Sequence, residues 1–265
     1  MQSLPELAYY GLKLICSPKL GEGNEAVRHV FHRLLYVILM RSEGHSHRPI
    51  PLVPTRAVLA AKDQAIQFVS HIVDELKETV LPTLRILIQH ICAQTVDKAE
   101  YRSSGAQAVV QLLSKMPCAE YASFIKWLYG FSLQSKVAYR MFALDVVMAL
   151  IEQPERQAEA SLPPELAPFL QHRFLVQVMV FGRRSDRAPA VRGHALTCLA
   201  HCLELQSPNA SESVQELFSA ISPQKVLETE GCESTNNIQD TNIQSTCMNY
   251  KTIEMTGKVD VTTFD

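Results

Sequence analysis

Apolar residues recur at helical spacing in one segment after another of this chain of 265 residues. This periodicity constrains the fold more than any other feature. In residues 134–153 the apolar positions step by four, three, four and three, which places them on one face of a helix with about 3.6 residues per turn. The same stepping runs through Ala65–Leu76, Leu84–Ile91 and Val191–Leu205. The first 221 residues contain no alternating run of β-branched residues, so the sequence predicts an all-α fold.

We expect ten helices, separated by segments rich in Pro and Ser. They cover residues 3–16, 24–41, 56–76, 83–95, 104–116, 119–131, 135–152, 165–181, 189–205 and 212–221. The connector Gln206–Asn209 leads to a predicted capping box of Ser213 and Glu216. Helices of this length in series indicate either a globular bundle or stacked helical hairpins.

A candidate internal repeat favours the stacked hairpins. Ala26-Val27-Arg28 matches Ala190-Val191-Arg192 at an offset of 164 residues, and two leucines follow each copy at equal distances. That offset equals four units of 41 residues. Helical repeats of the HEAT and armadillo type have about 40–47 residues, so the offset is compatible with a solenoid of about five helix pairs. Five matched positions leave a chance coincidence open.

Composition and cysteine usage limit the class of protein. Hydrophobic residues make up 47% and charged residues 20%, which is typical of a folded chain, and the net charge of −2 excludes a surface that is basic throughout. Seven scattered cysteines with no CxxC pair favour free thiols in a reducing compartment. The first residues lack the features of a signal peptide, and no apolar run approaches the about 18 residues of a membrane span. We therefore expect an intracellular protein that does not cross a membrane.

The composition changes from residue 222 onward. Residues 222–265 contain three lysines and seven acidic residues, and Thr, Asn, Gln and Ser replace most of the apolar residues. A segment with so little apolar surface does not offset the entropy lost when it becomes ordered. We therefore expect a helical repeat domain over residues 1–221 and a mostly disordered, polar and acidic tail over residues 222–265.

The sequence carries no catalytic motif: GxxxxGK[ST], HExxH, GxSxG and zinc-ribbon spacings are all missing from it. We therefore expect no enzyme activity, no cofactor and no small-molecule substrate. The densest set of metal-ligating residue types on one predicted helix is His194, Cys198, His201 and Cys202. Because a helix rises about 1.5 Å per residue, one straight helix does not bring all four to a tetrahedral metal, so we favour core packing and no metal. His45 and His47, in a Pro-rich loop, are a slightly better ligand pair, although we do not expect a metal there either.

An aromatic stretch offers a second alternative to plain packing. It comprises Tyr121, Phe124, Trp127, Tyr129 and Phe131. Such rings can stack on nucleobases, but aromatic residues at helical spacing usually fill the core between helices. Few basic residues are interleaved with these rings, so we favour the core.

The concentrated basic region of the chain is residues 171–192, which hold five arginines and one acidic residue. Phe174–Phe181 is an apolar helical run, and Gly182 suits its C-terminal cap. Pro189 suits the first position of the next helix, and Asp186 is expected beside the free N–H groups at that helix end.

The arginines of this region are candidate phosphate contacts. Arg183, Arg184 and Arg187 lie on a predicted exposed turn, and Arg173 precedes them on the apolar helix. Arg192 follows a buried valine, and we expect it to pair with an acid of a neighbouring repeat. A solvated turn without a ligand stays slightly favoured over a DNA contact.

Residues 185–196 resemble the HEAT-repeat pattern. The matching residues are Asp186, Pro189, Val191, Arg192, Ala195 and Leu196, followed by Leu199. Ser185–Arg192 together with Leu199–Glu204 is more narrowly similar to the D-type HEAT-repeat subunits of condensin II. Supporting segments are Phe31–Met40, Phe68–Leu76, Leu84–Cys92 and Leu113–Tyr121, and the similarity covers approximately residues 6–218.

The resemblance implies a HEAT/armadillo-like solenoid of helical hairpins that acts as a non-enzymatic scaffold in mitotic chromosome condensation. It implies a kleisin subunit and a pair of coiled-coil ATPases as partners, contact with DNA and histone tails, and a place in the nucleus on chromosomes. In this chain only the arginines at 183–187 offer such a DNA contact. The alternative is a cytoplasmic HEAT or armadillo adaptor, of the nuclear-transport or vesicle-coat kind, that binds an extended peptide. Composition does not separate the two.

Overall fold

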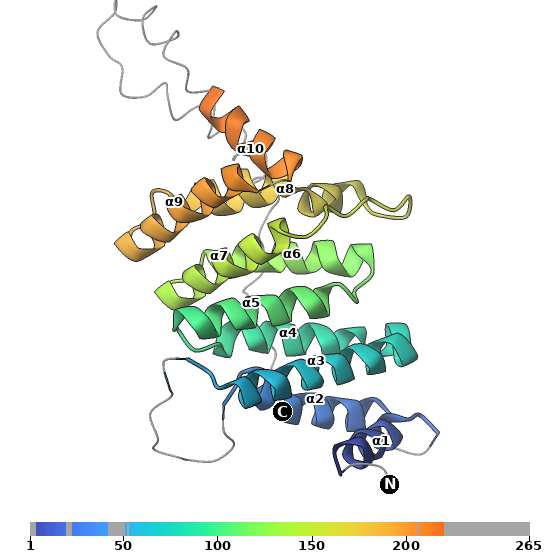
Figure 1. Cartoon of the computed structure of the whole chain (residues 1–265). Coiled ribbons are helices and arrows are strands. Elements are labelled where there is room, and N and C mark those ends of the chain that lie inside the picture. The colour runs from blue at the N-terminus through green and yellow to red at the C-terminus, as the bar shows by residue number, and fades with distance from the viewer. Residues whose placement is uncertain (1–3, 20–22, 42–50, 52, 206, 220–265) are drawn as a thin grey trace, which may run out of the picture. The chain divides into compact units, whose positions relative to one another are not determined.

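The chain folds into helices and turns throughout the part that the structure describes. In this computed structural model the described residues are 4–19, 23–41, 51, 53–205 and 207–219, and none of them lies in a strand. They divide into two compact units, of which the first ends at Phe124 and the second begins at Ile125. Figure 1 shows the helices of each unit. The predicted tail, residues 222–265, and the loop histidines His45 and His47 lie outside the described residues.

The described part of the first unit consists of two layers of helices. The elements are α1 (Leu4–Cys16), α2 (Asn24–Ile38), α3 (Arg56–Leu76), the short 3₁₀ helix η1 (Lys77–Val80), α4 (Leu81–Gln94), α5 (Ala99–Leu113) and the first part of α6 (Cys118–Ser132). Helix α2 packs against α3 and α4, and α5 also packs against α3 and α4. One layer therefore contains α1, α3 and α5, and the other contains α2 and α4 (Figure 1).

The apolar stripes that predict these helices form the core between the two layers. Val69 and Ile72 of α3, and Leu84, Ile88 and Ile91 of α4, are all at most 1% exposed. Burying one such side chain contributes about 1.5–3 kcal/mol, so the stripes hold the layers together.

The second unit repeats this arrangement. It contains the rest of α6, α7 (Val137–Ile151), the 3₁₀ helix η2 (Pro164–Leu170), α8 (His172–Phe174), the π-helix η3 (Leu175–Val180), the 3₁₀ helix η4 (Phe181–Arg183), α9 (Pro189–Glu204) and α10 (Pro208–Ser219). Helix α7 packs against η3 and α9, and α10 packs against α8, η3 and α9. Ten of the fifteen residues of α7 are buried, which makes it the central helix of the unit. Helix α2 packs on α3 and α4, and α7 packs on η3 and α9. Such packing of a helix on the elements that follow it is the pattern of stacked helical hairpins, so the predicted HEAT/armadillo-like fold is confirmed.

The single helix expected over residues 165–181 is wrong. A 3₁₀ helix ends at Leu170, and a second helical segment begins at His172 and widens into a π-helix. Pro168 lies inside the 3₁₀ segment and has no N–H to continue an α-helical ladder. Gln171 is extended, with a ψ of 136°, and separates the two segments.

Two local predictions are also wrong. Helix α10 begins at Pro208, so Ser213 and Glu216 lie inside the helix and form no capping box. The hydroxyl of Ser213 instead donates to the carbonyl one turn earlier. Gly182 does not cap a helix in the left-handed conformation, because it lies inside η4, and Gly23 is the one described glycine with a positive φ.

Candidate functional site: the arginine-rich turn

Residues 183–188, named here the arginine-rich turn, link η4 to α9 and lie against the turn between α6 and α7. Two hydrogen bonds join the turns. Arg183 Nη1 donates to the carbonyl of Ser132 at 3.2 Å, and Arg187 Nη2 donates to the carbonyl of Ser135 at 3.0 Å. The arginine-rich turn is therefore part of the contact between consecutive helical hairpins of the second unit.

Arg140 and Asp186 form a buried ion pair at this contact. Arg140 Nε and Nη2 donate to the two carboxylate oxygens of Asp186, each at 2.9 Å, and the two side chains are 3% and 4% exposed. Arg140 Nη1 donates to the carbonyls of Gln134 and Ser135 at 3.0 and 2.6 Å. A buried charge is costly unless it is paired and hydrogen-bonded, and this guanidinium is both. The pair therefore attaches the arginine-rich turn to α7.

Asp186 is ionised at neutral pH. Burial raises the pKa of its carboxyl group. The hydrogen bonds from Arg140 and from the Ala188 N–H, and the positive charges of Arg140 and Arg183, lower the pKa by more than burial raises it. The pKa of Asp186 therefore lies below its usual value. The bond from the Ala188 N–H, at 2.9 Å, confirms that Asp186 lies at the N-terminal end of α9.

Arg183 and Arg187 differ in how much of the side chain reaches solvent. The Arg183 side chain is 17% exposed, and its Nη1 lies 3.4 Å from a carboxylate oxygen of Asp186. Arg187 is exposed, and one of its terminal nitrogens donates to the Ser135 carbonyl. Because a guanidinium has five N–H donors, Arg187 keeps donors for a phosphate group.

Arg184 and Arg173 have partners elsewhere in the second unit. The guanidinium of Arg184 lies over the ring of Phe181, 3.9 Å from its centroid. Arg173 of α8 pairs with Glu216 of α10 at 3.1 Å, and the two side chains are 54% and 50% exposed. An ion pair this exposed contributes at most about 1 kcal/mol, so the Arg173 side chain is easily released.

Six of the seven residues of the HEAT-like pattern lie on α9, and Asp186 precedes the helix. Pro189 is the first residue of the helix, as predicted. Val191, Ala195 and Leu199 are buried in the core. Leu196 follows Ala195 by one position, which turns it away from the core, and it is 56% exposed.

The expected pairing of Arg192 is wrong. Its Nη1 donates to the backbone carbonyls of Asp186 and Arg187, at 2.8 and 3.3 Å. Asp186 pairs instead with Arg140 of the preceding hairpin, an arginine that was not predicted to have this role. The sequence does indicate that Arg140 is unusual, because Arg140 and Asp145 are the two charged residues of the otherwise apolar α7.

Two curated proteins match most of the chain. Condensin-2 complex subunit D3-L of Xenopus laevis is 53% identical over 237 residues, which are 89% of this chain and 16% of that protein. Condensin-2 complex subunit D3 of Mus musculus is 51% identical over 218 residues, which are 82% of this chain and 14% of that protein. Over most of its length, the chain is therefore similar to a segment of the D-type subunits of condensin II.

The chain spans less than a fifth of the length of the curated relatives that it matches. No family model matches the chain, and no solved structure does. Among the described residues, no helix has both the length and the apolar character that a membrane crossing requires.

The histidines and the cysteines of α9 make different contacts. His194 Nε2 lies 2.8 Å from the carboxylate of Asp145 in α7, and His201 Nε2 lies 3.4 Å from that of Glu152, the residue after α7. Cys198 and Cys202 are buried, and burial raises the pKa of each thiol, to about 12 for Cys198 and about 11 for Cys202. Within the described ranges, no group of three or more His, Cys, Asp and Glu side chains is placed to hold a metal ion.

The aromatic stretch packs α6 against α7, as the sequence favoured. Trp127, Phe131 and Tyr139 form a ladder with centroid distances of 5.1 and 4.7 Å. Phe131, in the middle of the ladder, is buried. Lys136 Nζ lies 4.7 Å from the centroid of the Tyr139 ring, at the exposed end.

Proposed function

We propose that this chain is a non-enzymatic scaffold segment of condensin II that acts in mitotic chromosome condensation, in the nucleus and on chromosomes. The observation that carries the proposal is the 53% identity to the Xenopus D3-L subunit over 89% of the chain. The stacked hairpins support it, because such stacks present long helical faces to extended partners.

The partners of this scaffold are the kleisin subunit of condensin II and, through it, the pair of coiled-coil ATPases. Helix α1 supports a protein partner. Its side chains Leu7, Tyr10 and Leu14 follow each other at three and four positions, and each is more than half exposed. An apolar stripe with this spacing suits the apolar face of a partner helix.

In this proposal, the arginine-rich turn and Arg173 form the surface that contacts DNA. Asp186 is 4% exposed and is neutralised by Arg140, so it does not offset the positive charge that the turn presents to solvent. Arg184 and Arg187 are the contacts to phosphate, and Arg183 positions the turn through Asp186. Histone tails are basic, so this positively charged surface does not suit them, and a histone contact would need a different surface of the chain.

Recovery of partners from mitotic cell extract tests the proposal. The tagged full chain is used as bait at two salt concentrations, and the bound proteins are identified by mass spectrometry. We expect the condensin II kleisin and the coiled-coil ATPases. Recovery of transport or coat factors in their place would favour the adaptor class, and recovery of neither from a folded chain would contradict the scaffold role of this segment.

The DNA contact has a separate test in the salt dependence of duplex binding. The variant Arg184→Glu with Arg187→Glu should flatten the slope of log affinity against log salt by about 0.9 for each lost phosphate contact. The control reverses two exposed charges at the ends of α3, Arg56→Glu with Lys77→Glu, for the same change in net charge. Equal slopes for the two variants would remove the DNA contact from the turn.

A further inference from the structure

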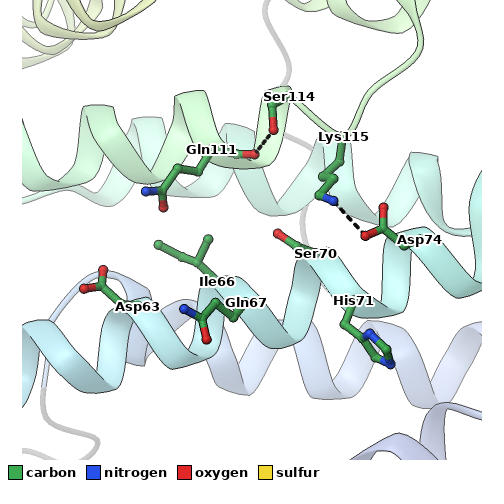
Figure 2. Close-up of a pocket in the computed structure, with 9 residues that line it drawn as sticks. All are labelled: Asp63, Ile66, Gln67, Ser70, His71, Asp74, Gln111, Ser114 and Lys115. Atoms are coloured by element: carbon green, nitrogen blue, oxygen red, sulfur yellow. Dashed lines mark hydrogen bonds and ion pairs between the residues drawn. The ribbon is translucent and has the colours of Figure 1, made fainter.

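A polar groove lies between α3 and α5 of the first unit (Figure 2). Its volume is about 610 Å³. Ile66 is its one apolar lining residue, and the other lining side chains are amides, hydroxyls, carboxylates, an imidazole and an ammonium group. A groove with this lining does not suit an apolar helix face, and its chemistry points to a ligand that forms many hydrogen bonds.

Two carboxamides face this groove from neighbouring helices. Gln67 lies on α3 and Gln111 on α5, both residues are exposed, and neither carboxamide is hydrogen-bonded to another described residue. In Figure 2 the side chain of Gln111 reaches from α5 toward α3. A carboxamide has an N–H₂ donor and a C=O acceptor side by side, which match the C=O and N–H of a peptide backbone. Two of them on adjacent helices suit the backbone of an extended polypeptide.

A carboxylate stands toward each end of the groove (Figure 2). The side chains of Asp63 and Asp74 are each 57% exposed. Their counter-ions are less exposed: Lys62 lies 3.3 Å from Asp63 with a side chain 9% exposed, and Lys115 lies 2.7 Å from Asp74 with a side chain 32% exposed. The groove therefore presents more negative than positive charge to solvent. Each carboxylate accepts several hydrogen bonds, so both have sites for a further cation. This charge disfavours nucleic acid.

The spacing of the two carboxylates defines the ligand further. Asp63 and Asp74 are eleven residues apart on α3, which is about 16 Å along a helix. An extended chain advances about 3.3 Å per residue, so about five residues cover this distance. We propose that the groove binds an extended segment of a partner protein in which two lysine or arginine residues are about five positions apart. Gln67 and Gln111 bind the backbone between these residues, and Asp63 and Asp74 bind the two cations. This site goes beyond the proposed function and does not depend on the condensin partners.

Fluorescence polarisation with synthetic peptides tests the site on the full chain. The probes are labelled ten-residue peptides of Ser, Thr and Val in which two lysines are separated by three to seven positions. We expect the tightest binding near a separation of five, because that spacing reaches both carboxylates. The same peptide with two glutamates should bind at least about tenfold more weakly, since like charges oppose each other. An affinity that is the same for every spacing, or for the lysine and glutamate peptides, overturns the proposal.

Matched variants separate this groove from other surfaces. Gln67→Ala with Gln111→Ala should weaken binding of the best lysine peptide by about tenfold, because hydrogen bonds to its backbone are lost. Gln64→Ala is the control, because Gln64 is an exposed glutamine of α3 outside the groove lining. Asp63→Asn with Asp74→Asn should remove the preference for lysine over glutamate. All these positions are exposed, and circular dichroism confirms folding. Wild-type affinity in the double glutamine variant overturns the site.

Discussion

Replacing Asp186 with alanine leaves the Arg140 guanidinium buried without its counter-ion. We expect this change to lower the free energy of unfolding of the second unit by about 3–5 kcal/mol. The structure supports a value in this range, because Arg140 is 3% exposed and loses two charge-assisted hydrogen bonds of 2.9 Å. It keeps only the carbonyls of Gln134 and Ser135 as acceptors, and the Ala188 N–H loses its partner as well.

Urea denaturation of the full chain at pH 7 measures this loss. Trp127 is the single tryptophan of the chain and lies in the second unit, so its fluorescence reports on the unit that contains the ion pair. The control is Arg173→Ala in the same unit. Its ion pair with Glu216 joins side chains that are 54% and 50% exposed, and its removal should cost at most about 1 kcal/mol. A loss below about 1 kcal/mol for Asp186→Ala would refute the role given to the buried pair.

The double variant and the pH dependence test the same reasoning independently. Arg140→Met combined with Asp186→Ala should destabilise the unit less than the sum of the single changes, because the second change removes the stranded charge. The pKa of Asp186 is lower in the folded than in the unfolded chain, so its contribution is complete above the usual carboxyl pKa of about 4. That contribution is lost as the pH falls through the lowered pKa. Additive single changes would contradict the coupling.

Three further predictions concern single side chains. Leu199→Asp places a charge in the core and should cost more than about 3 kcal/mol, whereas Leu196→Asp on the exposed face of the same helix should cost under about 0.5 kcal/mol; similar melting temperatures for the two variants would contradict the placement of α9. Gly193→Ala should raise the free energy of unfolding by about 0.5–1 kcal/mol, because the added Cβ meets open space in a helix. Urea denaturation measures this change, and a lower free energy of unfolding would contradict the prediction. Burial lowers the pKa of His172 although the charge of Glu155 opposes it, so the unfolded chain binds more protons and stability should fall as the pH drops below about 6.5. Thermal melts between pH 7 and 5 should show a smaller fall for His172→Gln, and an equal fall would contradict the burial of a neutral imidazole.

The helices with long apolar stripes were predictable from the sequence. Helix α3 has the predicted bounds, and α9 ends one residue before the predicted end, because in both an apolar stripe is bounded by residues that start or stop helices. Helix α5 begins at Ala99, five residues before its predicted start at 104. Ser103, Ser104 and Gly105 have low helix propensity, but packing of Tyr101, which is 2% exposed, decides the local structure.

The candidate site was predictable only in part. The excess of arginines and the position of Asp186 before α9 follow from local sequence. The partner of Asp186 does not, because Arg140 lies 46 residues away and meets it only when the hairpins stack. The groove between α3 and α5 was not predictable for the same reason, because Gln67 and Gln111 come together on one surface only in the folded unit.

Direct binding between the purified full chain and the purified kleisin subunit of condensin II tests the central claim most directly. Size-exclusion chromatography with light scattering measures the mass of the complex, and the kleisin of condensin I serves as the matched control. The proposal predicts a one-to-one complex with the condensin II kleisin and none with the control. A folded chain that binds neither kleisin, or both equally, would contradict the claim that this segment is a condensin II scaffold.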